Sequence, residues 1–176
     1  MRSGGFTQQL LWDYRIQLIP LACLAIVQSP DERALAERKS VIRILIADDH
    51  AVIRAGVRTI LMSRADIEVD EAVDGAEAVG KALRFKPDLV ILDLTMPVMG
   101  GYAAAVELRR VVPEIPVLFF SIHDGPQLIR DAKEVGARGF LRKSDAAYAL
   151  LDAVDELVNC KGTFFPESAE TEVFSQ

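Results

Sequence analysis

Cysteine is scarce in this chain, and so is any excess of positive charge. The 176 residues include two cysteines, Cys23 and Cys160, which are too few and too far apart for a disulfide framework or a zinc site. This cysteine content is typical of a reducing compartment, so we expect the protein in the cytoplasm. The formal net charge of −6 argues against a general nucleic-acid binder, because such a protein needs a basic face.

A long uninterrupted apolar run is missing as well. The segment 10–27 is apolar, but Asp13, Arg15 and Pro20 interrupt it. A membrane span needs about 20 apolar residues, so we expect none here. Residues 1–40 are treated as an N-terminal extension and linker, for which three interpretations stay open: sequence upstream of a true start at Val41, a loosely packed helix, or a membrane-directed segment.

The remainder has the pattern of an α/β domain. Apolar residues make up 51% of the chain and charged residues 26%, the balance of a globular protein. From Val41 onward, short apolar runs alternate with segments of helical periodicity. The predicted strands are 42–47, 67–72, 88–93, 116–121 and 138–141, and the predicted helices are 50–63, 74–85, 102–111, 126–135 and 145–158. This alternation indicates one domain at 41–160, a doubly wound, flavodoxin-like parallel sheet in the order 2-1-3-4-5, with a C-terminal tail at 161–176.

Acidic residues follow two of these strands. Asp48 and Asp49 come directly after the first strand, and Asp93 ends the third. Ligands of such a sheet gather at the break between strands one and three, so we expect these three carboxylates to converge there. Carboxylates this close repel one another unless a cation joins them, and a set of hard oxygen ligands suits Mg²⁺. The alternative, a helix cap at Asp48 and a solvated strand end at Asp93, explains one acid better than three.

A cation and a hydroxyl end two further strands. Lys143 follows the fifth strand, and Ser121 ends the fourth. The ammonium can pair with an anion at Asp93, and the hydroxyl can donate a hydrogen bond to the same anion. Together with the acids, these groups form a candidate site for a divalent cation and a phosphoryl group, with a carboxylate as the nucleophile.

Four motifs carry these residues in a familiar order and spacing. The motifs are LIADDH at 45–50, LVILDLTMPVMGG at 89–101, VLFFSIHD at 117–124 and GARGFLRKS at 136–144. They resemble the receiver domain of bacterial two-component response regulators, over residues 41 to about 160. The last two motifs are most similar to receivers attached to LuxR-type helix-turn-helix output domains. The resemblance implies a CheY-like fold and a phosphorylation-dependent signalling switch.

The resemblance also implies a role for each residue at the strand ends. Asp93 would be the phosphoacceptor. Asp49, Asp93 and the backbone carbonyl of Thr95 would hold Mg²⁺, with Asp48 assisting through water. Lys143 would pair with the phosphate. The implied chemistry is self-phosphorylation and self-dephosphorylation that depend on Mg²⁺, and no other enzyme activity is expected.

Two further residues would turn this chemistry into a conformational signal. In the implied mechanism, phosphorylation pulls the switch hydroxyl of Ser121 inward, and the switch aromatic Phe140 turns into the vacated space. An ordinary core position is the alternative for Phe140.

Partners follow from the same resemblance. A histidine kinase or a histidine phosphotransfer protein would supply the phosphoryl group, and a downstream protein target would receive the signal from a single-domain regulator. Dimerisation or docking is expected on the face formed by the fourth helix, the fifth strand and the fifth helix. The segment 163–166 could join this face, although packing against the end of the 145–158 helix is the simpler expectation. Direct nucleic-acid binding is not expected.

The sequence departs from the commonest receiver pattern at two places. Ser144 follows Lys143 where a proline in a cis peptide is frequent; we predict a cis bond here too, at a cost of about 3–4 kcal/mol. Ile122 stands where many receivers have alanine or glycine. We expect Ile122 and His123, together with Thr95, to set the lifetime of the phosphate. An exposed loop position is the alternative for His123.

Three other functions fit the sequence less well. A hydrolase of the haloacid dehalogenase class requires a second acid two residues after its nucleophile, but here Thr95 occupies that position. A binding module that no longer cycles phosphate is disfavoured by the intact set of acids. A DNA-binding regulator is disfavoured by the acidic charge, unless the chain is a fragment of a longer protein.

Overall fold

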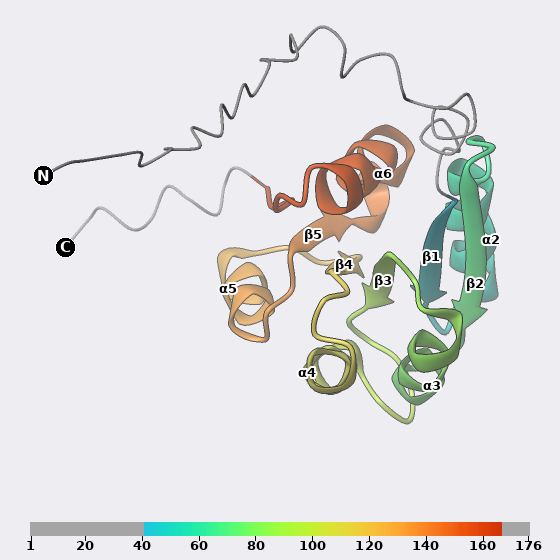
Figure 1. Cartoon of the computed structure of the whole chain (residues 1–176). Helices are drawn as coiled ribbons and strands as arrows, with labels where there is room; N and C mark the ends of the chain where they lie inside the picture. Colours follow the sequence, from blue (N-terminus) through green and yellow to red (C-terminus); the bar gives the residue numbers. More distant parts are fainter. Residues whose placement is uncertain (1–40, 167–176) are drawn as a thin grey trace, which may run out of the picture. The chain divides into compact units, whose positions relative to one another are not determined.

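Five short strands lie side by side in the computed structural model, which describes residues 41–166 (Figure 1). The strands are β1 (Ile42–Ala47), β2 (Ile67–Ala72), β3 (Leu89–Asp93), β4 (Val117–Ser121) and β5 (Gly139–Arg142). All neighbouring pairs are parallel, in the order β2-β1-β3-β4-β5. The predicted fold class and strand order are confirmed.

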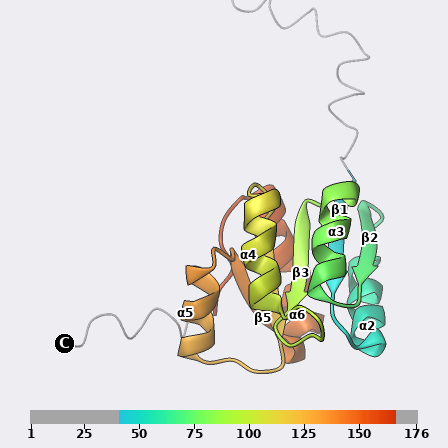
Figure 2. The ribbon, with the colours of Figure 1, turned by 90° about the horizontal axis from the view of Figure 1, so that it is seen from below.

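Helices cover both faces of this sheet. The α-helices are α2 (Ala51–Leu61), α3 (Gly75–Phe85), α4 (Gly101–Val111), α5 (Pro126–Glu134) and α6 (Ala146–Val154). Helices α2 and α6 pack on one face, while α3, α4 and α5 pack on the other, as the view from below shows (Figure 2). Because both faces are covered, the central strands β3 and β4 are buried along their whole length.

Alternate residues of each strand serve the two faces. In β1, Ile44 and Ile46 belong to the apolar cluster beneath α2 and α6, whereas Leu45 belongs to the cluster beneath α3, α4 and α5. In β4, Phe120 and Phe119 divide in the same way. The side-chain period of two along a strand therefore explains why continuous runs such as LVILD are buried throughout.

Side-chain hydrogen bonds define the start of α3. The Asp74 carboxylate accepts a hydrogen bond from the Glu77 N–H at 2.8 Å. The Glu77 carboxylate in turn accepts one from the Val73 N–H at 2.8 Å, one residue before the usual partner in a capping box. This reciprocal pair fixes the start of α3 directly after β2.

The chain after β5 differs from expectation in detail. A turn of 3₁₀ helix, η2 (Lys143–Asp145), follows β5, and α6 is succeeded by a π-helical turn, η3 (Asp155–Asn159). All peptide bonds in 41–166 are trans, so the prediction of a cis bond between Lys143 and Ser144 is wrong. The 3₁₀ turn begins at Lys143 with ordinary trans geometry, and this avoids the cost of a cis bond without proline.

The segment 163–166 meets both expectations. Phe164 is partly buried against the apolar cluster that contains Leu157 of the preceding helical segment, and it also joins the sheet. Phe164 forms a parallel bridge with Gly139 on the outer edge of β5. The Phe164 N–H donates to the Arg138 carbonyl at 2.9 Å, and the Phe140 N–H donates to the Phe164 carbonyl at 2.7 Å. The tail therefore joins the face of α5, β5 and α6, because unpaired backbone groups of an edge strand offer it hydrogen bonds.

Residues 1–40 and 167–176 lie outside the described part of the chain. For that reason, the three interpretations of the N-terminal extension stay predictions. Cys23 lies in the same part of the chain. Cys160 is an exposed free thiol. Among the helices of residues 41–166, none has the length and apolar character to cross a membrane.

Candidate functional site

The carboxyl ends of the strands form one pocket. Its volume is about 220 Å³, and it is lined by Asp49, His50, Asp93, Thr95, Ser121, Ile122, His123 and Lys143. Parallel strands all end at the same edge of the sheet, so residues as distant in the sequence as Asp49 and Lys143 meet here. The pocket collects every predicted site residue except Asp48, which is buried beside Lys143, and Phe140.

Lys143 stands between two buried carboxylates. Its Nζ lies 2.6 Å from Asp48 Oδ2 and 3.1 Å from Asp93 Oδ1, and 8% of the side chain is exposed. The ammonium also lies 5.8 Å from the centre of the Phe120 ring, within the range of a cation–π contact. A single cation thus balances part of the negative charge that the strand ends bring together.

Asp93 is the last residue of β3, and its carboxylate is almost completely enclosed. Burial raises the pKa of the Asp93 carboxyl above its ordinary value, since the charged form is disfavoured away from water. The hydrogen bond and charge of Lys143 oppose this rise, as does the N–H of Thr95, whereas the charge of Asp48 adds to it. The site therefore holds a more basic carboxylate than usual, which a cation would stabilise.

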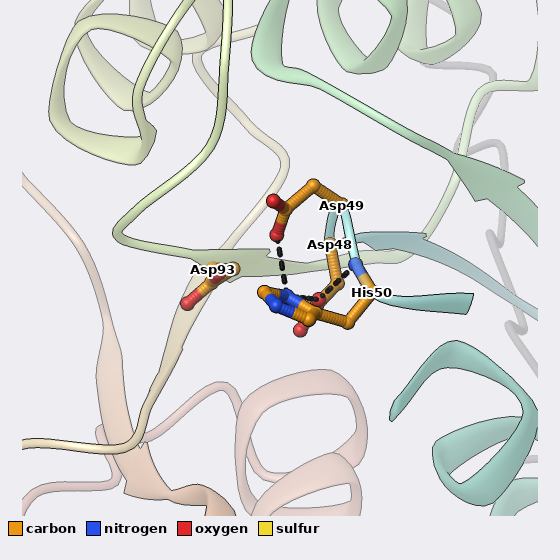
Figure 3. A group of neighbouring side chains, drawn as sticks. All are labelled: Asp48, Asp49, His50 and Asp93. Carbon is orange, nitrogen blue, oxygen red and sulfur yellow. Dashed lines mark hydrogen bonds and ion pairs between the residues drawn. The ribbon is translucent and has the colours of Figure 1, made fainter. Parts of the chain in front are cut away.

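The acids have the arrangement that a hard metal ion needs. Ligand atoms of Asp48, Asp49, His50 and Asp93 all lie within 4.8 Å of one another (Figure 3). Asp48 Oδ2 is buried and accepts no regular hydrogen bond, and its close neighbour is the Lys143 ammonium. Oxygen donors at these spacings fit Mg²⁺, which binds a few carboxylates and completes its shell with water and phosphate. The residues present fit the ion.

His50 is the residue that the sequence reasoning missed. Its Nδ1 lies 2.7 Å from Asp49 Oδ1 and 3.4 Å from Asp48 Oδ1 (Figure 3). The backbone N–H of His50 donates a hydrogen bond to Asp48 Oδ1 at 2.8 Å. It occupies the N-cap position of α2, yet its side chain makes no capping hydrogen bond. Its place directly after two aspartates in LIADDH is the sequence signal that points to it.

The remaining predicted residues border the same pocket. Ser121 is buried at the end of β4, and its Oγ accepts a hydrogen bond from the His123 N–H at 3.1 Å. Thr95 and His123 are exposed, and Ile122 is 68% exposed. Because these three side chains border the pocket, they can influence how easily solvent enters it.

Phe140 lies away from the pocket. It is fully buried in the apolar cluster beneath α3, α4 and α5, which also contains Phe119. This is the core position that the alternative interpretation described, and the switch role of Phe140 stays a prediction. Its backbone, however, is joined to the tail by the hydrogen bond to Phe164.

Comparison with known proteins identifies this arrangement. The family model described as the response regulator receiver domain matches residues 44–155. The response regulator protein VraR of Staphylococcus aureus is 33% identical over 127 residues, a match that covers 72% of this chain and 61% of VraR. The chain therefore spans about 61% of the length of this curated relative.

Solved structures agree with the sequence match. A two-component response regulator of the LuxR family from Aurantimonas sp. SI85-9A1 is 32% identical, with a TM-score of 0.69 over 76% of this chain and 96% of that one. The response regulator domain of CheB from Thermotoga maritima is 30% identical, with a TM-score of 0.63 over 68% of this chain and 97% of that one. The chain belongs to the response regulator receiver domains of two-component systems.

Proposed function

We propose that Asp93 accepts a phosphoryl group from a histidine kinase or a histidine phosphotransfer protein, and that the domain works as a phosphorylation-dependent switch in a two-component phosphorelay. One observation carries the proposal. The buried Asp93 carboxylate has an ammonium on one side and acids able to hold a metal on the other, in a pocket open to solvent.

Asp49, Asp93 and the Thr95 carbonyl would hold Mg²⁺, and Asp48 would assist through water. The ion, when bound, supplies positive charge that neutralises the phosphoryl oxygens during transfer. Asp49 suits this role because its carboxylate is partly exposed at the rim, while Asp48 is enclosed beneath it. These assignments make the site a phosphoacceptor with self-phosphorylation and self-dephosphorylation as its chemistry.

The side chains of the pocket divide the remaining work. An Asp93 carboxylate oxygen forms a bond to phosphorus as the bond from phosphorus to the donor nitrogen breaks, so the aspartyl phosphate replaces the phosphohistidine. Lys143, already 3.1 Å from Asp93 Oδ1, pairs with a phosphoryl oxygen of the product. The Ser121 hydroxyl accepts from the His123 N–H, which leaves its own hydrogen free to reach the phosphate.

The signal would leave through the face of α5, β5 and α6. Ser121 ends β4, and Phe140 lies in the neighbouring strand β5, so a movement of Ser121 toward the phosphate opens space that the Phe140 ring can enter. We propose that this face then binds a downstream protein or a second copy of the chain, in the cytoplasm.

Ile122 and His123 are proposed to set the phosphate lifetime, with Thr95, because all three border the pocket. Dephosphorylation half-lives of Ile122→Ala and His123→Ala, measured after removal of the phosphodonor, test this role. We expect a shorter half-life for Ile122→Ala, since a smaller side chain admits water more freely. Unchanged half-lives in both variants would exclude it.

Titration with beryllofluoride and Mg²⁺, followed by NMR of the backbone amides, tests the switch. We expect shifts that begin at the pocket, reach β5 and α5, and vanish in Asp93→Asn. Ser121→Ala should bind the analogue but lose the shifts in β5, whereas Ser144→Ala, an exposed serine outside the pocket, should behave as wild type. If the wild-type chain shows no shifts with the analogue, the result would instead favour a binding module that does not cycle phosphate.

A further inference from the structure

The imidazole of His50 is directed at the acids rather than at the helix it precedes. An N-cap side chain usually satisfies a backbone N–H of the first turn, and His50 makes no such bond. Its Nδ1 instead lies 2.7 Å from Asp49 Oδ1. The turn that places it there is held by the hydrogen bond from the His50 N–H to the buried Asp48 carboxylate.

This placement adds a nitrogen donor to a set of oxygens. In the residues that the structure describes, the group of candidate metal ligands is formed by three aspartates and His50, with ligand atoms within 4.8 Å of one another. Carboxylates and carbonyls suit Mg²⁺, whereas an imidazole is a preferred ligand of Zn²⁺ and other late first-row ions. Among these candidate ligands, the imidazole is the group that favours Zn²⁺ over Mg²⁺.

We propose that His50 is a metal ligand that lets this pocket bind Zn²⁺ in competition with Mg²⁺. Mg²⁺ is held by oxygen atoms alone, while Zn²⁺ is held by the imidazole together with the carboxylates of Asp49 and Asp93. The inference rests on the proposed function, because it takes these two acids as the metal ligands. Its consequence is that His50 influences which divalent cation occupies the pocket.

His50 leaves its contact with Asp49 when it binds zinc. The neutral imidazole offers one ring nitrogen as a ligand, and the other keeps its hydrogen for a carboxylate. Of the His50 side chain, 64% is exposed, so the ring can turn without disturbing the core. The same exposure means that its removal should leave the fold intact.

The chain supplies its own control for this idea. It contains two histidines, and both His50 and His123 line the pocket. The imidazole of His123 is absent from the group of candidate ligands, although its residue is also exposed to solvent. If any histidine near the acids affects metal binding, replacing either His50 or His123 should change it. If His50 is a metal ligand, only its replacement should.

The test is calorimetric titration of the full chain with Zn²⁺ and with Mg²⁺, for wild type, His50→Ala and His123→Ala. We expect His50→Ala to lower the affinity for Zn²⁺ relative to that for Mg²⁺ by about tenfold or more, because loss of a group that merely supports a metal ligand already costs about 10-fold. His123→Ala should keep the wild-type ratio. An unchanged ratio in His50→Ala would overturn the inference.

NMR of the two imidazoles gives a readout that is independent of affinity, and it separates the pocket from zinc bound at the Cys160 thiol. Saturation with Zn²⁺ should shift the ring nitrogens of His50 and leave those of His123 in place. Unshifted His50 nitrogens would overturn the inference even if zinc binds. Failure of the proposed function would look different: wild type and Asp93→Asn would then bind Mg²⁺ equally well and resist phosphorylation by acetyl phosphate.

Discussion

Replacing Lys143 by methionine should expose how strongly the strand ends repel one another. Methionine keeps an unbranched apolar side chain of similar length, so the packing against the Phe120 ring is largely retained. What disappears is the ammonium that lies 2.6 Å from Asp48 and 3.1 Å from Asp93. Both carboxylates then stay in the protein without the cation that pairs with them.

The expected loss follows from burial. The side chains of Asp48 and Asp93 are 1% and 6% exposed, so solvent screens their charges poorly. Removal of one partner from a buried ion pair costs about 3–5 kcal/mol, and we expect Lys143→Met to lower the free energy of unfolding by that amount at pH 8 without Mg²⁺. Lys133, exposed on α5 above the Phe165 ring, is the matched control; Lys133→Met should cost less than about 1 kcal/mol.

The loss should depend on pH with a definite sign. Burial raises the pKa of Asp93, and Lys143 is the main influence that lowers it, so the variant raises that pKa further. A native state that binds a proton more tightly than the unfolded state loses stability as the pH rises. The penalty of Lys143→Met should therefore be smaller at pH 5 than at pH 8.

Mg²⁺ should offset much of the stability lost in Lys143→Met, because in this variant the ion pairs with the carboxylates without competition from the ammonium. Saturation at 100 times the dissociation constant contributes about 2.7 kcal/mol to the stability of a protein that binds a ligand only when folded. Urea unfolding at pH 5 and pH 8, with and without Mg²⁺, measures all of these terms. A variant as stable as wild type at pH 8 without Mg²⁺ would refute the electrostatic reasoning.

Three more changes probe the scaffold around the site. Gly101→Ala should lower the free energy of unfolding by about 1–3 kcal/mol in urea, because its Cβ would lie 2.2 Å from the Asp93 carbonyl oxygen; Gly100→Ala, whose Cβ would lie 3.5 Å from its nearest neighbour, should cost much less, and equal losses would refute the close approach. The Asp93→Asn variant should have a higher melting temperature than wild type at pH 7, because burial raises the pKa of this carboxyl and its ionised form destabilises the fold. This difference should shrink as the pH falls toward about 4, where the wild-type carboxyl is protonated. A lower melting temperature of the variant at pH 7 would contradict the reasoning. Arg138→Ala removes the guanidinium bonds to the Gly162 carbonyl at 2.6 and 3.1 Å, so the Phe140 amide, which is bonded to the tail, should exchange with solvent about tenfold faster; an unchanged rate would show that the tail holds without them.

Much of the fold could be predicted because its strands are buried on both faces. Runs such as LVILD leave few choices other than a central parallel strand, and β1 and β2 begin and end where the apolar residues do. The convergence of Asp48, Asp93, Ser121 and Lys143 then follows from topology, since parallel strands end at one edge. No knowledge of side-chain geometry was needed to bring them together.

What the sequence did not predict depends on backbone geometry that side-chain patterns do not record. The bridge between Phe164 and Gly139 is made by main-chain groups, so the letters of the tail do not reveal it. The peptide between Lys143 and Ser144 is trans because a 3₁₀ turn starts there, a feature that a proline-based analogy overlooks. The direction of the His50 ring likewise follows from a turn that the Asp48 carboxylate holds.

The central claim is that Asp93 accepts the phosphoryl group, and intact mass spectrometry after incubation with acetyl phosphate and Mg²⁺ tests it most directly. The account predicts one added phosphoryl group on wild type and on Asp152→Ala, an exposed acid outside the pocket, and none on Asp93→Ala. Chelation of the divalent cation should abolish labelling of wild type. Equal labelling of Asp93→Ala and wild type would contradict the account.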